Sequence, residues 1–352
     1  MYSINQTPVR TSKSFNINNI SVKDEVFNNE INKFDNVNIL NNSSKVIIEQ
    51  NKTPINLKYG LGQELVNEIK NKSNQNFKIV VDSKTNTLTK IDFNFDEENT
   101  TLIENIDITV NENTNSTFVI KYEAKQNSKC YHNGIIKLIA KKNAKINLVV
   151  INLLNDLSNN FITIDNNIAE NSKVDYTIVD FGGQNTVSNY YSNINGDYAE
   201  SNLNTIYIGK NQQVLDLNYI AELYGKYSKA NIEVQGALKD KARKNFKGTI
   251  DFKKGCKKAI GEENENCMLL SDTAKSIALP MLLCSEEDVE GAHSTSAGKV
   301  GSKELFYIMS RGFDLKEAQK LLVRANFNKI LNGILDNETK CKICKEIDER
   351  LN

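Results

Sequence analysis

Five short stretches of this chain follow one pattern at a nearly constant interval. Each begins with a polar turn and continues into alternating apolar residues, and successive starts lie 28, 28, 29 and 29 residues apart. The stretches begin at Asn115, Asn143, Asn171, Glu200 and Lys229. A fixed period of this length is typical of stacked repeats, in which each unit buries its apolar face only against its neighbours. The interval therefore predicts a stacked-repeat fold.

A second series of strand-like runs lies between these starts, so each repeat holds about two strands. The runs begin at Gly134, Phe161, Asn189, Leu217 and Phe246. A β-sandwich also contains many short strands, but it does not require similar pairs at a fixed step. A parallel β-helix does, because each coil adds one rung to each of its sheets. We therefore expect a mainly β protein, with a parallel β-helix of about five or more coils over residues 76–300. Val174 and Ile146 should then stack on successive rungs.

The segments that flank the repeats have a different pattern of apolar and polar residues. Residues 1–75 predict a small mixed region, with short helices over 23–34 and 62–72. Residues 301–352 predict a C-terminal helical domain. Because the ends of a solenoid need to be capped, we expect this domain to close the open end of the β-stack.

Helix boundaries in the C-terminal segment are signalled by particular residues. A helical pattern over 304–311 is followed by Gly312, a residue typical of the position after a helix. Asp314 lies three residues before Glu317, which predicts a capping box at the start of a second helix. A last helix is expected over 336–351.

Composition limits the classes of partner. Lys plus Arg and Asp plus Glu both total 44, and only five of these residues are arginine. No net charge therefore favours nucleic acid or a membrane surface as a partner. The first residues lack the apolar core of a secretory signal, and no apolar run has the length of a membrane span. Six scattered cysteines in a chain of 352 residues fit a reduced, cytoplasmic compartment.

Few residues suggest chemistry. His293 lies in an acidic segment, 286–298, near Cys284, and imidazole, thiolate and carboxylate are the usual ligands of transition metals. The alternative is a strand edge with solvated acids and one surface histidine. Cys341 and Cys344 form a C-x-x-C motif that suits redox or zinc chemistry, or is only a pair of thiols near a loosely held end. Small buried side chains or incidental surface thiols are expected at Cys130, Cys256 and Cys267.

Two catalytic classes are disfavoured by missing motifs. Ser294 follows His293, but no G-x-S-x-G elbow surrounds it, which argues against a hydrolase. The chain has no Walker A lysine loop, so we expect no nucleotide hydrolysis by the chain itself, and no enzyme activity.

A set of short motifs between residues 245 and 330 resembles the SufB/SufD family of iron–sulfur cluster assembly proteins. The strongest block is Leu305-Phe-Tyr followed by Ser310-Arg-Gly312, after the histidine. The matching segments are Asn245-Phe-Lys-Gly-Thr-Ile-Asp-Phe252, Met268-Leu-Leu-Ser271, Leu279-Pro280, Asp288-Val-Glu-Gly-Ala-His293, Gly298-Lys-Val, Glu304-Leu-Phe-Tyr-Ile-Met-Ser-Arg-Gly312 and Glu317-Ala318. Pro8-Val-Arg-Thr11 is similar to the N-terminal motif of the family, with Ser12 where the family has Trp.

The resemblance implies a fold and a set of partners. It implies a right-handed parallel β-helix with an N-terminal region and a C-terminal helical domain, a scaffold role, and a complex with the ATPase subunit SufC. That subunit docks on the helical domain, so Phe306, Tyr307 and Arg311 become candidate partner-binding residues, although Arg311 has the alternative role of tying a helix end to the β-stack. In the family, SufB and SufD pair through the ends of their β-helices, and clusters form near that interface.

Two departures indicate the SufD-like branch. SufB-type chains carry a cysteine where this chain has Ala274, and a glutamate where it has Ser294. The histidine that matches His293 is the residue on the SufD side that is implicated in cluster assembly, whereas Cys284 has no counterpart in the motif. One histidine cannot hold a cluster, which takes four ligands, mostly thiolates. We therefore expect no cofactor bound stably to the isolated chain, and a transient iron–sulfur cluster only in the complex.

Two other functions compete with this interpretation. One is a carbohydrate-active enzyme built on a β-helix, and the other is a stand-alone metal or redox protein that uses Cys341 and Cys344. Whether the chain pairs with a separate SufB-like subunit or with itself is open from the sequence.

Overall fold

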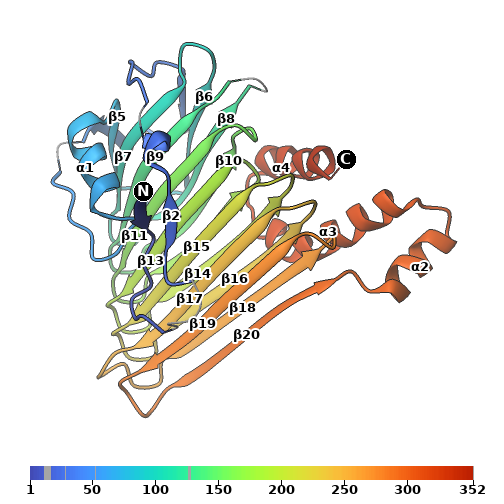
Figure 1. The fold of residues 1–352 in the computed structure, drawn as a ribbon. Coiled ribbons are helices and arrows are strands. Elements are labelled where there is room, and N and C mark those ends of the chain that lie inside the picture. The colour runs from blue at the N-terminus through green and yellow to red at the C-terminus, as the bar shows by residue number, and fades with distance from the viewer. Residues whose placement is uncertain (12–16, 28, 52, 126–127, 352) are drawn as a thin grey trace.

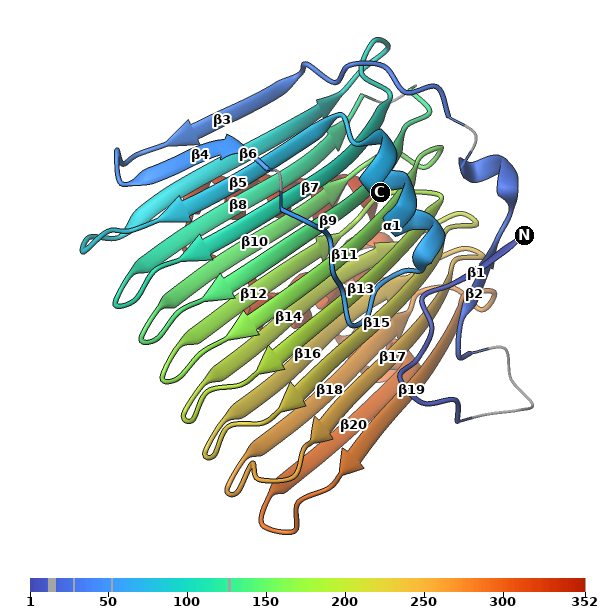
Figure 2. The same ribbon diagram turned by 90° about the vertical axis from the view of Figure 1, so that its left-hand side faces the viewer.

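The computed structural model describes residues 1–11, 17–27, 29–51, 53–125 and 128–351. The chain forms a parallel β-solenoid of about eight turns with helices outside it (Figures 1 and 2). Each turn adds one strand to each of two nine-stranded sheets, and strands of successive turns pair in parallel. The predicted parallel β-helix, with two strands in each repeat, is confirmed.

The two sheets are called sheet I and sheet II. Sheet I contains β3 (Val37–Asn41), β6 (Thr87–Phe95), β8 (Asn115–Ala124), β10 (Lys145–Leu153), β12 (Lys173–Asp180), β14 (Glu200–Gly209), β16 (Lys229–Leu238), β18 (Ile260–Leu269) and β20 (Glu290–Lys299). Sheet II contains β4 (Val46–Gln50), β5 (Gln75–Val81), β7 (Thr101–Val110), β9 (Tyr131–Ala140), β11 (Asn159–Ile168), β13 (Asn185–Ile194), β15 (Val214–Leu223), β17 (Arg243–Phe252) and β19 (Lys275–Cys284). The first strand of each sheet, β3 or β4, pairs antiparallel with the next strand.

The pairing register confirms the predicted stacking but corrects the residues at which two of the repeats begin. Val174 pairs with Ile146 on the next rung, as predicted. However, Lys145 and Lys173, and not Asn143 and Asn171, occupy the position of Asn115. Side chains alternate along a strand with a period of two, so a two-residue shift leaves every side chain on the same face. The hydrophobic pattern alone therefore does not reveal the shift.

Two of the asparagines expected to open repeats, Asn143 and Asn171, are in fact turn residues, and Asn113 occupies the equivalent turn before β8. Asn113, Asn143 and Asn171 have φ angles of 57°, 59° and 54°, in the left-handed region that asparagine tolerates better than most residues. The Asn143 amide donates to Oδ1 of Asn113 at 2.8 Å, and the Asn171 amide donates to Oδ1 of Asn143 at 2.7 Å. These side chains link the turns of successive coils.

The N-terminal region covers part of the outer face of sheet II. It contains a short antiparallel ribbon, β1 (Tyr2–Ile4) with β2 (Ile20–Val22), and the helix α1 (Gln63–Lys72), which was predicted. The helix expected over 23–34 is wrong: a single 3₁₀ turn spans Asp24–Phe27. The Asn29 side chain donates to the Val26 carbonyl at 2.8 Å. Such local side-chain bonds compete with helix continuation.

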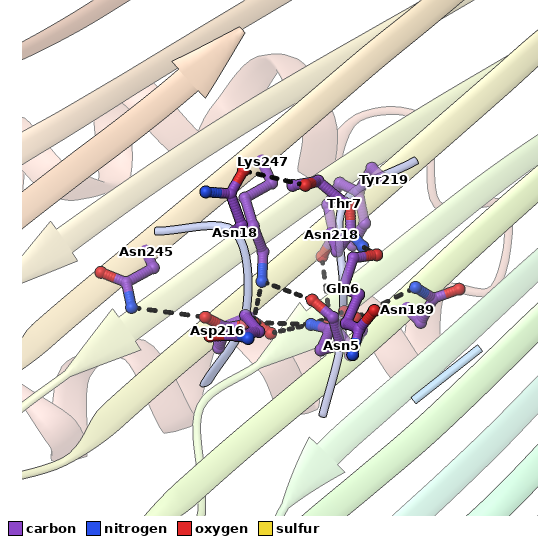
Figure 3. Close-up of polar contacts among 12 residues, drawn as sticks. Asn5, Gln6, Thr7, Asn18, Asn189, Asp216, Asn218, Tyr219, Asn245 and Lys247 are labelled. Carbon is purple, nitrogen blue, oxygen red and sulfur yellow. Dashed lines mark hydrogen bonds and ion pairs between the residues drawn. The ribbon is translucent and has the colours of Figure 1, made fainter. Parts of the chain in front are cut away.

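One buried ion pair ties the first residues of the chain to sheet II (Figure 3). The Lys247 ammonium lies 2.5 Å from Oδ1 of Asp216, and both side chains are fully buried. The same ammonium donates to the Asn5 carbonyl at 2.8 Å, while the Asn5 amide donates to Asp216 Oδ1 at 2.7 Å. Burial raises the pKa of Asp216 and lowers that of Lys247, so the pair and the Asn5 contacts must offset the cost of removing both charges from water.

Three helices follow the solenoid: α2 (Ser302–Ser310), α3 (Leu315–Leu331) and α4 (Asn337–Arg350). The capping box of Asp314 and Glu317 is present, and Gly312 follows α2 with a φ of 100°. Within the described residues, no helix is long and apolar enough to cross a membrane.

The expectation that these helices close the end of the β-stack is wrong. Helices α3 and α4 lie on the outer face of sheet I (Figure 1), where Phe327 and Ile343 join a buried cluster with Ile151, Phe181 and Ile206. Apolar side chains at alternate outward positions of β10, β12 and β14 provide the partner that an amphipathic helix needs. The last strand, β20, is left without a cap among the described residues, and all ten of its residues are exposed.

Candidate functional site at the open end of the solenoid

The open end is the edge formed by β20 in sheet I and β19 in sheet II. His293 lies on β20, is exposed, and pairs in register with Glu263 of β18. Register partners on parallel strands present their side chains on the same face. Glu263 is fully buried inside the solenoid, so His293 occupies the interior-facing position of the last, solvent-exposed rung.

Cys284, the weak candidate from the sequence, lies at the end of β19 and is exposed. Its thiol donates to the Glu286 carbonyl at 2.9 Å. It belongs to sheet II, whereas His293 belongs to sheet I. No set of three His, Cys, Asp or Glu side chains in the described part of the chain is arranged to hold a metal ion. The structure therefore does not combine Cys284 and His293 into a complete metal site.

The interior one rung below His293 is polar. Glu263, Glu265 and Cys267 alternate along β18 and are all buried. Oε1 of Glu265 accepts hydrogen bonds from the Lys244 ammonium at 2.7 Å and from the Tyr207 hydroxyl at 3.1 Å. Lys244 and Glu265 thus form a buried ion pair inside the solenoid.

Glu263 lacks such partners. Among the described residues neither of its carboxylate oxygens has a hydrogen-bond partner. Its carboxylate lies against Gly248 of β17, where a Cβ would come within 2.1 Å of Oε1. Burial, with a smaller effect from the nearby charge of Glu265, raises the pKa of Glu263 to about 8. Sequence reasoning missed this residue. A signal was present, because strand alternation places Glu263 on the same face as Cys267, and burial was one of the two alternatives expected for Cys267.

A second buried polar group lies deep in the early coils. The Tyr122 hydroxyl donates to Oε1 of Glu104, and His132 has its Nε2 3.4 Å from that oxygen and its Nδ1 2.6 Å from Oδ1 of Asn160. All four side chains lie inside the solenoid, at 0–1% exposure. A site closed in this way cannot meet a substrate, so we assign these residues a structural role.

The candidate partner-binding residues lie on α2, which projects away from the two sheets (Figure 1). Phe306 and Tyr307 are 75% and 59% exposed, respectively. Arg311 lies over the Tyr307 ring at 5.3 Å, and its guanidinium donates to the Tyr307 hydroxyl at 3.3 Å. Arg311 thus contacts the Tyr307 side chain of its own helix. Further exposed apolar side chains lie on α2, on α3 and in the link between them: Met309, Phe313, Leu315 and Leu321.

The C-x-x-C motif lies on α4. Cys341 is exposed and Cys344 is half-buried against the cluster under α3 and α4, and both are free thiols. Cys130, Cys256 and Cys267 are buried, which agrees with the expectation that they are small buried side chains.

A parallel solenoid of two sheets with three helices after it defines the class of β-solenoid proteins, and comparison with known proteins identifies the family. Residues 93–326 match the family described as "SUF system FeS cluster assembly, SufBD core domain". This match covers well over half of the chain, so the chain belongs to the SufB/SufD family of iron–sulfur cluster assembly proteins, as the motifs suggested.

Individual relatives indicate the branch. The iron–sulfur cluster assembly protein SufD of Bacillus subtilis is 26% identical over 261 residues, which cover 73% of this chain and 59% of that protein. SufD of Escherichia coli is 23% identical over 59% of this chain and 49% of its own length. A SufBD family protein of Pyrococcus horikoshii is 26% identical over 58% of this chain and 45% of its own length. The chain is therefore SufD-like, and it spans about half the length of these relatives.

Proposed function

We propose that this chain is a non-catalytic, cytoplasmic scaffold subunit of a SufBCD-type complex. In this proposal, a SufC-type ABC ATPase binds the exposed surface of α2, and a SufB-like subunit or a second copy of this chain pairs with the open end at β20. His293 contributes to cluster assembly at that second interface, with the remaining ligands supplied by the partner. The two competing functions are not carried forward, because the chain belongs to the SufB/SufD family.

The observation that carries this proposal is the exposed aromatic surface of α2. Large exposed apolar patches on soluble proteins commonly mark interaction sites, and aromatic residues dominate the energetics of such interfaces. Phe306 and Tyr307 are exposed on a helix that packs mainly against α3. The family motif matched by Glu304 to Gly312 lies on the same helix.

A point substitution on α2 tests ATPase binding better than a deletion. Removing residues 301–352 would also remove the apolar cover that Phe327 and Ile343 provide for sheet I, so lost binding would have two explanations. We expect Phe306→Asp to weaken binding of a purified SufC-type ATPase by roughly 30-fold or more, because a buried aromatic anchor typically contributes 2 kcal/mol or more. Isothermal titration calorimetry measures this change.

Leu335 provides the matched control. It is 67% exposed on the loop between α3 and α4, away from α2. Leu335→Asp introduces the same charge and should leave ATPase affinity unchanged. Both variants should unfold at the temperature of the parent chain, because both positions are exposed. Equal affinity of Phe306→Asp and the parent chain would refute α2 as the docking surface.

A further inference from the structure

Glu263 is a buried carboxylate that no group in the described chain satisfies. It is fully buried, and both of its oxygens lack a partner, whereas Glu265 two positions along the same strand is bound by Lys244 and Tyr207. An unpaired buried carboxylate is costly. The interior is nevertheless shaped for it, because Gly248 leaves the space that the carboxylate occupies.

A small cation would satisfy this carboxylate in its ionised form, and the open end of the solenoid lies one rung away. The rung above Glu263 is the last one, and on it the exposed His293 is the register partner of Glu263. Neighbouring strands lie about 4.8 Å apart, so two side chains on the same face of adjacent rungs can reach one ion. One imidazole nitrogen and carboxylate oxygens form a donor set that suits first-row transition metals.

We propose that Glu263 and His293 together bind one divalent transition-metal ion of the Fe²⁺ class at the open end of the solenoid. The ion enters past β20 and lies between the last two rungs of sheet I. This inference rests on the proposed role of His293 in cluster assembly and deepens it, because it adds a second ligand from this chain and assigns iron as the bound species. Two protein ligands make an incomplete and therefore weak site, and the partner subunit or water fills the other positions. This agrees with the finding that no three potential ligands converge in the described residues.

The test uses cobalt as a spectroscopic probe. Co²⁺ is titrated into the metal-free full chain without oxygen, and visible absorption and calorimetry report binding. We expect the parent chain to bind one Co²⁺, and Fe²⁺ to compete for it. Glu263→Gln and His293→Ala should each weaken binding by about tenfold or more, since even the loss of an outer-shell partner typically weakens metal binding 10- to 100-fold.

Glu262→Gln is the matched control, because it removes the same charge from the neighbouring, exposed position of β18. It should leave the affinity for Co²⁺ unchanged. Absence of Co²⁺ binding by the parent chain, parent-like binding by Glu263→Gln or His293→Ala, or equal loss in Glu262→Gln would each overturn the inference. These results are independent of ATPase binding through α2, so failure of the metal site and failure of the proposed function are distinguishable.

Discussion

Lys247→Ala is expected to lower the free energy of unfolding by about 3–5 kcal/mol, because it leaves Asp216 buried without its counter-ion. The Asp216 carboxylate and the Lys247 ammonium are both fully buried. The substitution also removes the donor to the Asn5 carbonyl, so the N-terminal residues should detach from sheet II. Urea unfolding measures the loss of stability, and increased proteolysis near Asn5 would report the detachment.

An exposed ion pair serves as the control. Lys258 and Asp288 are 2.7 Å apart, but their side chains are 60% and 46% exposed. Lys258→Ala should leave stability nearly unchanged, because exposed pairs contribute little. The double variant Lys247→Met/Asp216→Asn should recover much of the loss, since it removes both buried charges. If Lys247→Ala unfolds like Lys258→Ala, the buried pair does not anchor the N-terminal residues.

Glu263 should make the stability of the metal-free chain depend on pH. Its pKa is raised from 4.5 to about 8 in the folded chain. The folded state therefore holds this proton more tightly than the unfolded state, and the resulting stabilisation is fully present below about pH 4.5 and is lost as the pH rises through about 8. Between about pH 5 and 9 the loss is on the order of 4 kcal/mol.

Glu263→Gln should remove this pH dependence and make the chain more stable than the parent at the alkaline end. The measurement is a series of urea unfolding curves with a chelator present, with Glu262→Gln as the surface control. The titratable groups that face Glu263 are Glu265 and Cys267 on β18, Lys244 on β17 and His293 on β20. Parallel pH profiles for the parent and Glu263→Gln would show that Glu263 does not hold its proton in the folded chain.

Local patterns explain which parts of the fold could be predicted. The repeat interval and the alternation of apolar residues are properties of single strands and turns, and they predicted a parallel solenoid. The helix-end signals at Gly312 and Asp314 also depend only on residues close in sequence, and they were predicted as well. The predicted start of one repeat, Asn143, lies two residues before the true position, Lys145. A shift of two residues leaves every side chain on the same face of the sheet, so the apolar pattern could not reveal the error.

Features that depend on contacts between distant segments could not be predicted. The sequence shows that α3 and α4 are amphipathic, but not that their apolar faces meet Ile151 and Phe181 on the outer face of sheet I. Glu263 is similar: an acidic residue in a polar run suggests solvent, and only the stacking of β17, β18 and β20 buries it beside Gly248 and below His293. The role of His293 stays a prediction.

Hydrogen exchange along β20 tests most directly the proposal that a partner covers the open end of this chain. The experiment compares amide exchange of residues 290–299 in the isolated chain and in the chain mixed with a SufB-like subunit and a SufC-type ATPase. We predict that the alternate amides of β20 that point away from β18 exchange rapidly in the isolated chain, because β20 is an exposed edge strand, and become protected in the assembly. Equally rapid exchange of β20 in an assembly that demonstrably contains this chain would contradict it.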